Sequence, residues 1–276
     1  MNRPSVTSIA VGTGGGIASA IAVGALFSLF DYHVVMSATE WWTLLPGAFV
    51  LGFVTVALSV HTGLVSPGGG FLALLVAVVY TELTTSPPRA VVERGDDVIV
   101  DGSFHALSYA ETWYVWLALL LVAGVAEFAI RRGYSLEDGR LRNLPTLPLS
   151  RTDLWLVVVG CSGAVGLATM ILLVRGVLWE TASGYGIGFV AAAVATVVPL
   201  AALLSYGIVS PFVLYGWLVM ATLHTEAFTA PDSGLHIPIL GVSSIGFVIV
   251  AGLELLVRSR LRGWDGGRFA SAVSQE

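Results

Sequence analysis

The sequence predicts an all-α integral membrane protein with eight transmembrane helices, a parallel 4+4 internal repeat and both termini in the cytoplasm. Its composition gives the first reason, because 56% of the 276 residues are hydrophobic and only 11% are charged. A soluble chain has about 25% charged residues, and a mean hydropathy of +0.86 is typical of a chain that lies in a bilayer. The distribution of arginines and a duplicated segment give the other two reasons. Too few residues remain outside the apolar stretches for a separate soluble catalytic domain.

Eight apolar stretches are long enough to cross the hydrocarbon core, which needs a helix of about 20 residues. We expect these spans at residues 8–30, 42–61, 67–84, 112–130, 154–175, 186–204, 211–227 and 237–257. In the outer loop at 85–110, residues 90–101 read AVVERGDDVIVD, with apolar residues on both sides of a Gly-Asp turn. Two short apolar runs around such a turn predict a β-hairpin.

The arginines divide unequally between the two sides of the membrane. All thirteen basic residues are arginine, and ten of them fall on the side that holds both termini. These ten are Arg3, Arg131, Arg132, Arg140, Arg142, Arg151, Arg258, Arg260, Arg262 and Arg268. Because cytoplasmic loops carry the excess of basic residues, both termini are predicted to be cytoplasmic. An even number of spans requires the same, and the expected localisation is the cell membrane.

A shift of 144 residues places the third span on the seventh. Gly63-Leu-Val-Ser-Pro67 then falls on Gly207-Ile-Val-Ser-Pro211. Between residues 61–85 and 205–229, 9 of 25 positions are identical. Four spans in each copy would leave both copies in the same orientation, which makes the repeat parallel.

A shift of 127 residues aligns the ends of the two copies, with Glu127 on Glu254 and Arg131 on Arg258. Each glutamate stands four residues before its arginine, the favourable order for an intrahelical ion pair. The predicted domains are a first four-helix repeat at 1–133, a cytoplasmic linker at 134–153, a second four-helix repeat at 154–258 and a cytoplasmic tail at 259–276.

Other repeated residues also have structural explanations. Ser66-Pro67 and Ser210-Pro211 predict helix starts, in which serine caps the helix and proline takes the first helical position. Small residues at i,i+4 spacing let two helices approach closely in a membrane, and we expect the first and fifth helices to pack through such a stripe. The stripe consists of Gly12, Gly16 and Ala20, with Gly160, Ala164 and Ala168 in the second half.

Glu82 and Glu226 are the candidate functional residues. Both lie at the outer ends of helices, where a carboxylate opposes the helix dipole, and neither has an arginine at i±3 or i±4. With Tyr80 and His224, they are hypothesised to form an outward-facing cation site; the alternative is a rim of solvated carboxylates. No ionisable residue lies near the centre of any span, which argues against a proton pump.

Composition and one short motif add two resemblances. The acidic, lysine-free chain, with a net charge of −5, resembles proteins of salt-loving, haloarchaeal-type organisms, in which salt screens carboxylate repulsion. Gly160-Cys161-Ser162-Gly163 resembles the Gly-x-Ser-Gly of rhomboid proteases, although no histidine is placed to serve Ser162 as a base. No Cys/His spacing suits a metal, no cofactor is expected, and no basic face suits nucleic acid.

Two functional hypotheses from different classes follow, a transporter or channel-like protein first and a membrane subunit as its alternative, with a weaker third. The duplication and the paired outer glutamates favour a small-solute or ion transporter or channel-like protein, with a path between the two halves. The apolar span centres and the lack of a soluble domain favour a non-catalytic membrane subunit or scaffold. Its partners would be the lipid bilayer and other membrane subunits or copies of itself. The third is an intramembrane lipid-modifying enzyme.

Overall fold

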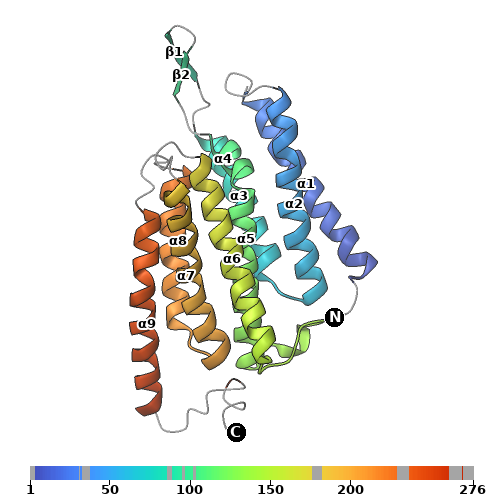
Figure 1. Cartoon of the computed structure of the whole chain (residues 1–276). Helices are drawn as coiled ribbons and strands as arrows, with labels where there is room; N and C mark the ends of the chain where they lie inside the picture. The colour runs from blue at the N-terminus through green and yellow to red at the C-terminus, as the bar shows by residue number, and fades with distance from the viewer. Residues whose placement is uncertain are drawn as a thin grey trace. The chain divides into compact units, whose positions relative to one another are not determined.

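The fold is known from a computed structural model. It describes residues 4–30, 32, 38–85, 89–94, 97–101, 104–175, 182–228, 236–260 and 269, with only the backbone at 38–40, 89–94, 97–101, 138, 175, 182–183, 223–228 and 236–238. The helices are α1 (Val6–Leu29), α2 (Ala38–Thr62), α3 (Ser66–Thr84), α4 (His105–Glu111), α5 (Trp113–Gly133), α6 (Arg151–Arg175), α7 (Ala182–Tyr206), α8 (Ser210–Phe228) and α9 (His236–Arg260) (Figure 1). A short 3-10 helix, η2 (Asp138–Arg140), follows α5.

Seven of the described helices are long and apolar enough to cross a membrane: α1, α2, α3, α5, α6, α7 and α9. The described side chains of α8 form a shorter apolar helix, Ser210–Thr222. The protein is therefore a polytopic helical membrane protein. Of the eight predicted spans, seven meet this criterion within the part of the chain that the structure describes.

The predicted hairpin is confirmed. Strand β1 (Arg89–Arg94) pairs antiparallel with β2 (Asp97–Asp101), from Arg89 opposite Asp101 to Arg94 opposite Asp97. The register shifts between Ala90 and Val92. The turn residues at 95–96 lie outside the described residues.

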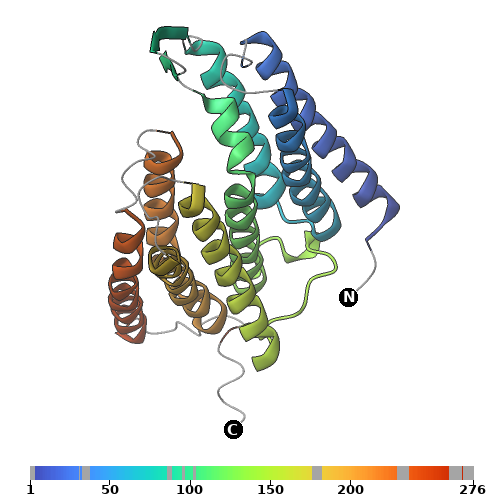
Figure 2. The same cartoon turned by 45° about the horizontal axis from the view of Figure 1, so that its top comes forward.

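The chain divides into two compact units, at residues 2–120 and 121–276, with the boundary inside α5. In the first unit, α2 packs against α1, α3 and α4. In the second unit, α7 contacts α6, α8 and α9, and these neighbours can be followed in Figures 1 and 2. The span of α7 is 56% buried and that of α9 only 11%, so α7 is the central helix of the second unit.

Glycines bring α1 and α2 together. A Cβ on Gly12 would lie 2.6 Å from the Cβ of Ala57, and one on Gly16 would lie 2.8 Å from the backbone oxygen of Phe49. The small-residue stripe on α1 therefore faces α2 at these two residues, and its packing against the fifth predicted span stays a prediction. Gly160, its counterpart on α6, faces open space. Helices α1 and α2 follow each other in the chain, and consecutive elements joined by a short connection usually pack together.

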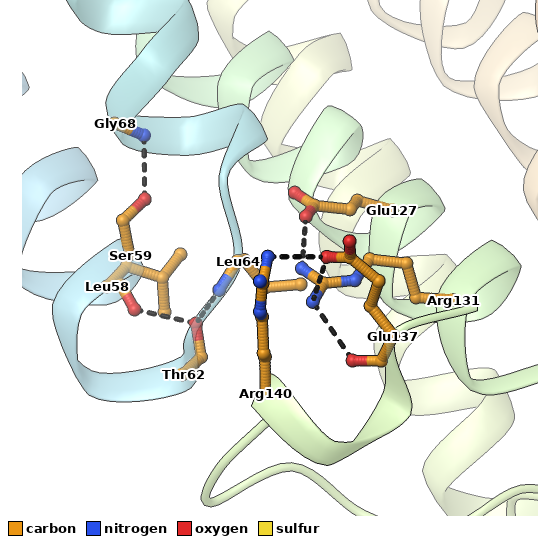
Figure 3. A network of polar contacts seen from close by, with 9 residues as sticks. All are labelled: Leu58, Ser59, Thr62, Leu64, Gly68, Glu127, Arg131, Glu137 and Arg140. Atoms are coloured by element: carbon orange, nitrogen blue, oxygen red, sulfur yellow. Dashed lines mark hydrogen bonds and ion pairs between the residues drawn. The ribbon is translucent and has the colours of Figure 1, made fainter. Parts of the chain in front are cut away.

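The Ser-Pro pairs begin helices, but not as capping serines. Helices α3 and α8 begin at Ser66 and Ser210 themselves, one residue earlier than expected. The N-cap of α3 is Val65, which has no side-chain hydrogen bond to offer. Instead, Ser59 of α2 accepts a hydrogen bond from the N–H of Gly68 at 2.7 Å (Figure 3). The capping group thus comes from the preceding helix.

We predict that Gly52→Ala destabilises the protein by about 1–3 kcal/mol, the usual cost of overpacking. The new Cβ would lie 2.5 Å from the carbonyl oxygen of Gly15, and backbone cannot move aside as a side chain can. Gly14→Ala on α1 is the matched control, because nothing lies within 4 Å of its added Cβ. That variant is expected to keep or slightly raise the stability. Thermal unfolding in detergent measures both, and equal melting temperatures would contradict the prediction.

Candidate functional site

Glu82, in the last turn of α3, is buried, with 3% of its surface exposed. The hydroxyl of Tyr32 donates a hydrogen bond to its Oε1 at 2.6 Å, and the N–H of Ala106 donates to its Oε2 at 2.9 Å. Ala106 belongs to the first turn of α4, where the helix dipole favours an anion. The carboxylate therefore joins α3 to α4 and to the connection between α1 and α2.

Aromatic rings lie against Tyr32, and a pair of hydroxyl groups lies farther along α4. The ring of Tyr32 lies 4.9 Å from that of Phe27 and 5.9 Å from that of Phe104. One turn along α4, the hydroxyl of Tyr109 lies 3.0 Å from that of Ser19 on α1. Tyr32, Tyr109 and Ser19 are all 0% exposed. The cluster is thus a dry junction between four segments of the first unit.

Both tyrosines are held in their protonated form. Burial, with the hydrogen bond to Glu82, raises the pKa of Tyr32 above its ordinary value of 10. Burial raises the pKa of Tyr109 to about 12, against a smaller opposite effect of the Ser19 hydrogen bond. Because both folded-state pKa values are raised, the stability linked to these groups is fully present below about pH 10. It is lost as the pH rises from there through the raised values.

The other candidate residues of the outer site are placed differently. Tyr80 is 66% exposed and stands two positions before Glu82, which turns it to another face of α3. The side chains of His224 and Glu226 lie outside the described residues. Glu82 is not a solvated rim carboxylate, and its partners Tyr32 and Ala106 were missed. No local pattern in the sequence points to either partner. The cation site formed by all four residues stays a prediction.

A second polar cluster surrounds the turn between α7 and α8. Glu254 accepts hydrogen bonds from the N–H groups of Val209 (3.3 Å) and Ser210 (2.8 Å), at the start of α8. These N–H groups have no partner within their own helix. The carboxylate is only 15% exposed, so α9 supplies the cap that the Ser210 side chain was predicted to supply.

Arg258 completes this cluster from the next turn of α9. It forms the predicted ion pair with Glu254 and donates to the carbonyl oxygens of Gly207 (2.9 Å) and Tyr206 (3.4 Å) at the end of α7. The hydroxyl of Tyr134 accepts from Arg258 at 3.0 Å and donates to Gly207 O. Anion and cation thus face the positive end of α8 and the negative end of α7, as the two helix dipoles favour.

The corresponding pair on α5 is also formed. Arg131 donates to Glu127 at 2.7 Å, and both side chains are about seven-eighths buried, with 12% and 13% exposed. Arg131 also donates to the backbone oxygen of Glu137 at 3.2 Å, while the Glu137 carboxylate pairs with Arg140 at 2.9 Å (Figure 3). This arrangement fastens the linker that follows α5 to the end of that helix.

The protease-like motif on α6 places Ser162 in the interior of the second unit. Ser162 is 2% exposed, and its hydroxyl has no hydrogen-bond partner there. No group of three or more His, Cys, Asp or Glu side chains is placed to hold a metal in the described part of the chain.

No known protein family, no characterised protein and no solved structure matches the chain.

We predict that Tyr32→Phe and Glu82→Gln each destabilise the protein by about 1–3 kcal/mol, because each leaves a buried polar group without its partner. The double variant should cost less than the sum of the two, because a glutamine amide has one acceptor oxygen, and without the Tyr32 hydroxyl only the N–H of Ala106 needs it. Tyr80→Phe, on the exposed face of α3, is the control and should be nearly neutral. Thermal unfolding in detergent of the wild type, both single variants and the double variant measures these costs. Strict additivity would show that the two groups act independently.

Proposed function

We propose that the chain consists of two copies of a four-helix unit, with eight spans and both termini in the cytoplasm. Equivalent turns support the repeat. Gly63 and Gly207, 144 residues apart, have positive φ angles of 76° and 65°. Their N–H groups donate to the carbonyl oxygens of Ser59 (2.8 Å) and Leu203 (2.9 Å), which are also 144 residues apart. A positive φ favours glycine, which is why glycine stands at both positions.

Packing inside each unit supports the same alignment. In the first unit, the ring of Phe71 faces Gly52, with 3.0 Å between its Cζ and an added Cβ. In the second unit, the hydroxyl of Tyr215 lies 2.8 Å from that of Thr196. Both residues of the second pair follow those of the first by 144 positions. An aromatic ring thus crosses to the same point of the preceding helix in each unit.

The topology can be tested with single cysteines in a Cys161→Ala background. Cysteines at positions 96 and 232 are expected to react with a membrane-impermeant maleimide in intact cells. Cysteines at 142 and 262 should react only after permeabilisation, because the arginine-rich side is cytoplasmic. Position 232 tests α8 in particular, since it follows that helix. Labelling of 142 and 232 from the same side would contradict eight spans.

For its role, we propose a non-catalytic membrane subunit that organises or stabilises other membrane components, with the bilayer and further membrane subunits as its partners. The observation that best supports this role is that the largely buried carboxylates bind groups of the protein itself. Glu82 accepts hydrogen bonds from Tyr32 and Ala106, Glu254 caps α8, and Glu127 pairs with Arg131. In a membrane, ionisable side chains mark solute paths by default, but Glu82 and Glu254 join one helix to another, and Glu127 forms an ion pair within α5.

Transport of a small solute or ion is the second candidate. It is favoured by the repeat, because parallel repeats related by an axis along the membrane normal recur in transporters. The burial of Glu82 removes one of the two carboxylates on which this hypothesis was based. Glu226 is then the one carboxylate of the pair that still supports the transport hypothesis.

Purification in mild detergent distinguishes the two roles. A membrane subunit is expected to elute as an assembly heavier than the 28.9 kDa chain, with a second polypeptide at fixed stoichiometry that withstands a salt wash. A monomer contradicts this role. A saturable thermal shift with one ion or solute, worth about 2.7 kcal/mol at a hundredfold excess over Kd, would favour transport if Glu226→Gln abolished it and Glu127→Gln did not.

A further inference from the structure

Phe269, the residue beyond α9 that the structure describes, lies inside the second unit. Phe269 is 3% exposed, and its ring lies 5.7 Å from that of Tyr134 at an interplanar angle of 63°. This edge-to-face arrangement is one that aromatic pairs prefer. The ring also lies against Gly133 and Gly207, and a Cβ on either glycine would overlap with it. We call the site formed by Gly133, Tyr134 and Gly207 the aromatic notch.

The two glycines of the notch have different explanations. Gly207 has a φ of 65°, so the turn between α7 and α8 requires glycine whatever its surroundings. Gly133 ends α5 without a positive φ, and the left-handed residue after that helix is Ser135. The conformation of the backbone therefore does not require glycine at 133. Glycine is required at 133 because the Phe269 ring fills the space that a side chain there would occupy.

The notch adjoins the polar cluster at the α7–α8 turn. Tyr134, whose ring Phe269 contacts, donates its hydroxyl to Gly207 O and accepts from Arg258 at 3.0 Å. A docked Phe269 fixes the ring of Tyr134 and covers Gly207. Its departure would free the tyrosine and admit water to the hydrogen bonds that join α5, the α7–α8 turn and α9.

We propose that Phe269 is an intramolecular latch: its side chain inserts into the notch, and its release loosens the α7–α8 turn. The occupant is a segment of this chain. The latch is independent of whether the protein is a membrane subunit or a transporter, because it concerns only contacts within the second unit.

Limited trypsin digestion of the purified full-length protein tests the latch, because trypsin cleaves after Arg268 only when the neighbouring Phe269 has left the notch. Intact-mass spectrometry follows the loss of residues 269–276. Gly133→Val fills the notch and leaves the cleavage sequence unchanged, so cleavage should become roughly ten- to hundredfold faster, as loss of the burial of one phenylalanine implies. Gly139→Val, at an open glycine, is the control and should stay within about twofold of the wild type.

Phe269→Ala gives a second route if Gly133→Val does not fold, with each rate divided by that of the same chain in denaturant. Tyr134→Phe keeps the ring and should leave the tail docked. The latch is overturned if Gly133→Val is cleaved at the wild-type rate, or if the wild type is cleaved as fast as Phe269→Ala. Release of the tail by Tyr134→Phe would also overturn it, because the hydroxyl network would then be what holds the tail.

Discussion

Wherever a helix ends near the bilayer, its last N–H and C=O groups need partners, because an unpaired polar group in hydrocarbon costs several kcal/mol. At the reversal between α7 and α8, the pair Glu254 and Arg258 satisfies this requirement. The carboxylate takes the N–H groups that open α8, and the guanidinium takes the carbonyl groups that close α7. One ion pair thus fixes the angle of a turn and the register of α9 against it.

Glu82 obeys the same constraint at the other end of its helix in the first unit. A carboxylate in the last turn of α3 opposes the dipole of that helix, but the N–H of Ala106 brings the positive end of α4 to it. The phenolic proton of Tyr32 occupies the other oxygen. A buried carboxylate with both oxygens bonded is costly to leave half-paired. This cost explains why Tyr32 and the short helix α4 are held at one place on α3.

Close contact between helix backbones is the other interaction that stabilises the fold. Inside a membrane, an apolar side chain gains little free energy by moving from lipid to protein, so the hydrophobic effect contributes little to helix association. Gly12, Gly15 and Gly16 let α1 lie directly on α2, and Gly166 on α6 and Gly241 on α9 do the same against α7. The remaining surface of these helices is aliphatic and exposed, as for Ile21 on α1 and Val242 on α9. Such a surface suits contact with lipid chains or with neighbouring membrane helices.

Hydropathy and short-range spacing were enough to predict seven of the spans, the hairpin and the pairs Glu127–Arg131 and Glu254–Arg258. Each of these depends on residues a few positions apart, where helix and turn geometry set the distance. The capping of α8 by Glu254 and of α4 by Glu82 joins residues 44 and 24 positions apart, and the Tyr32–Glu82 bond spans 50. The choice of α2 as the partner of the glycine stripe is of the same kind. Only the packing of whole helices decides such contacts. Many residues of one type could serve as each partner, and the positions of the backbones determine which of them comes within reach.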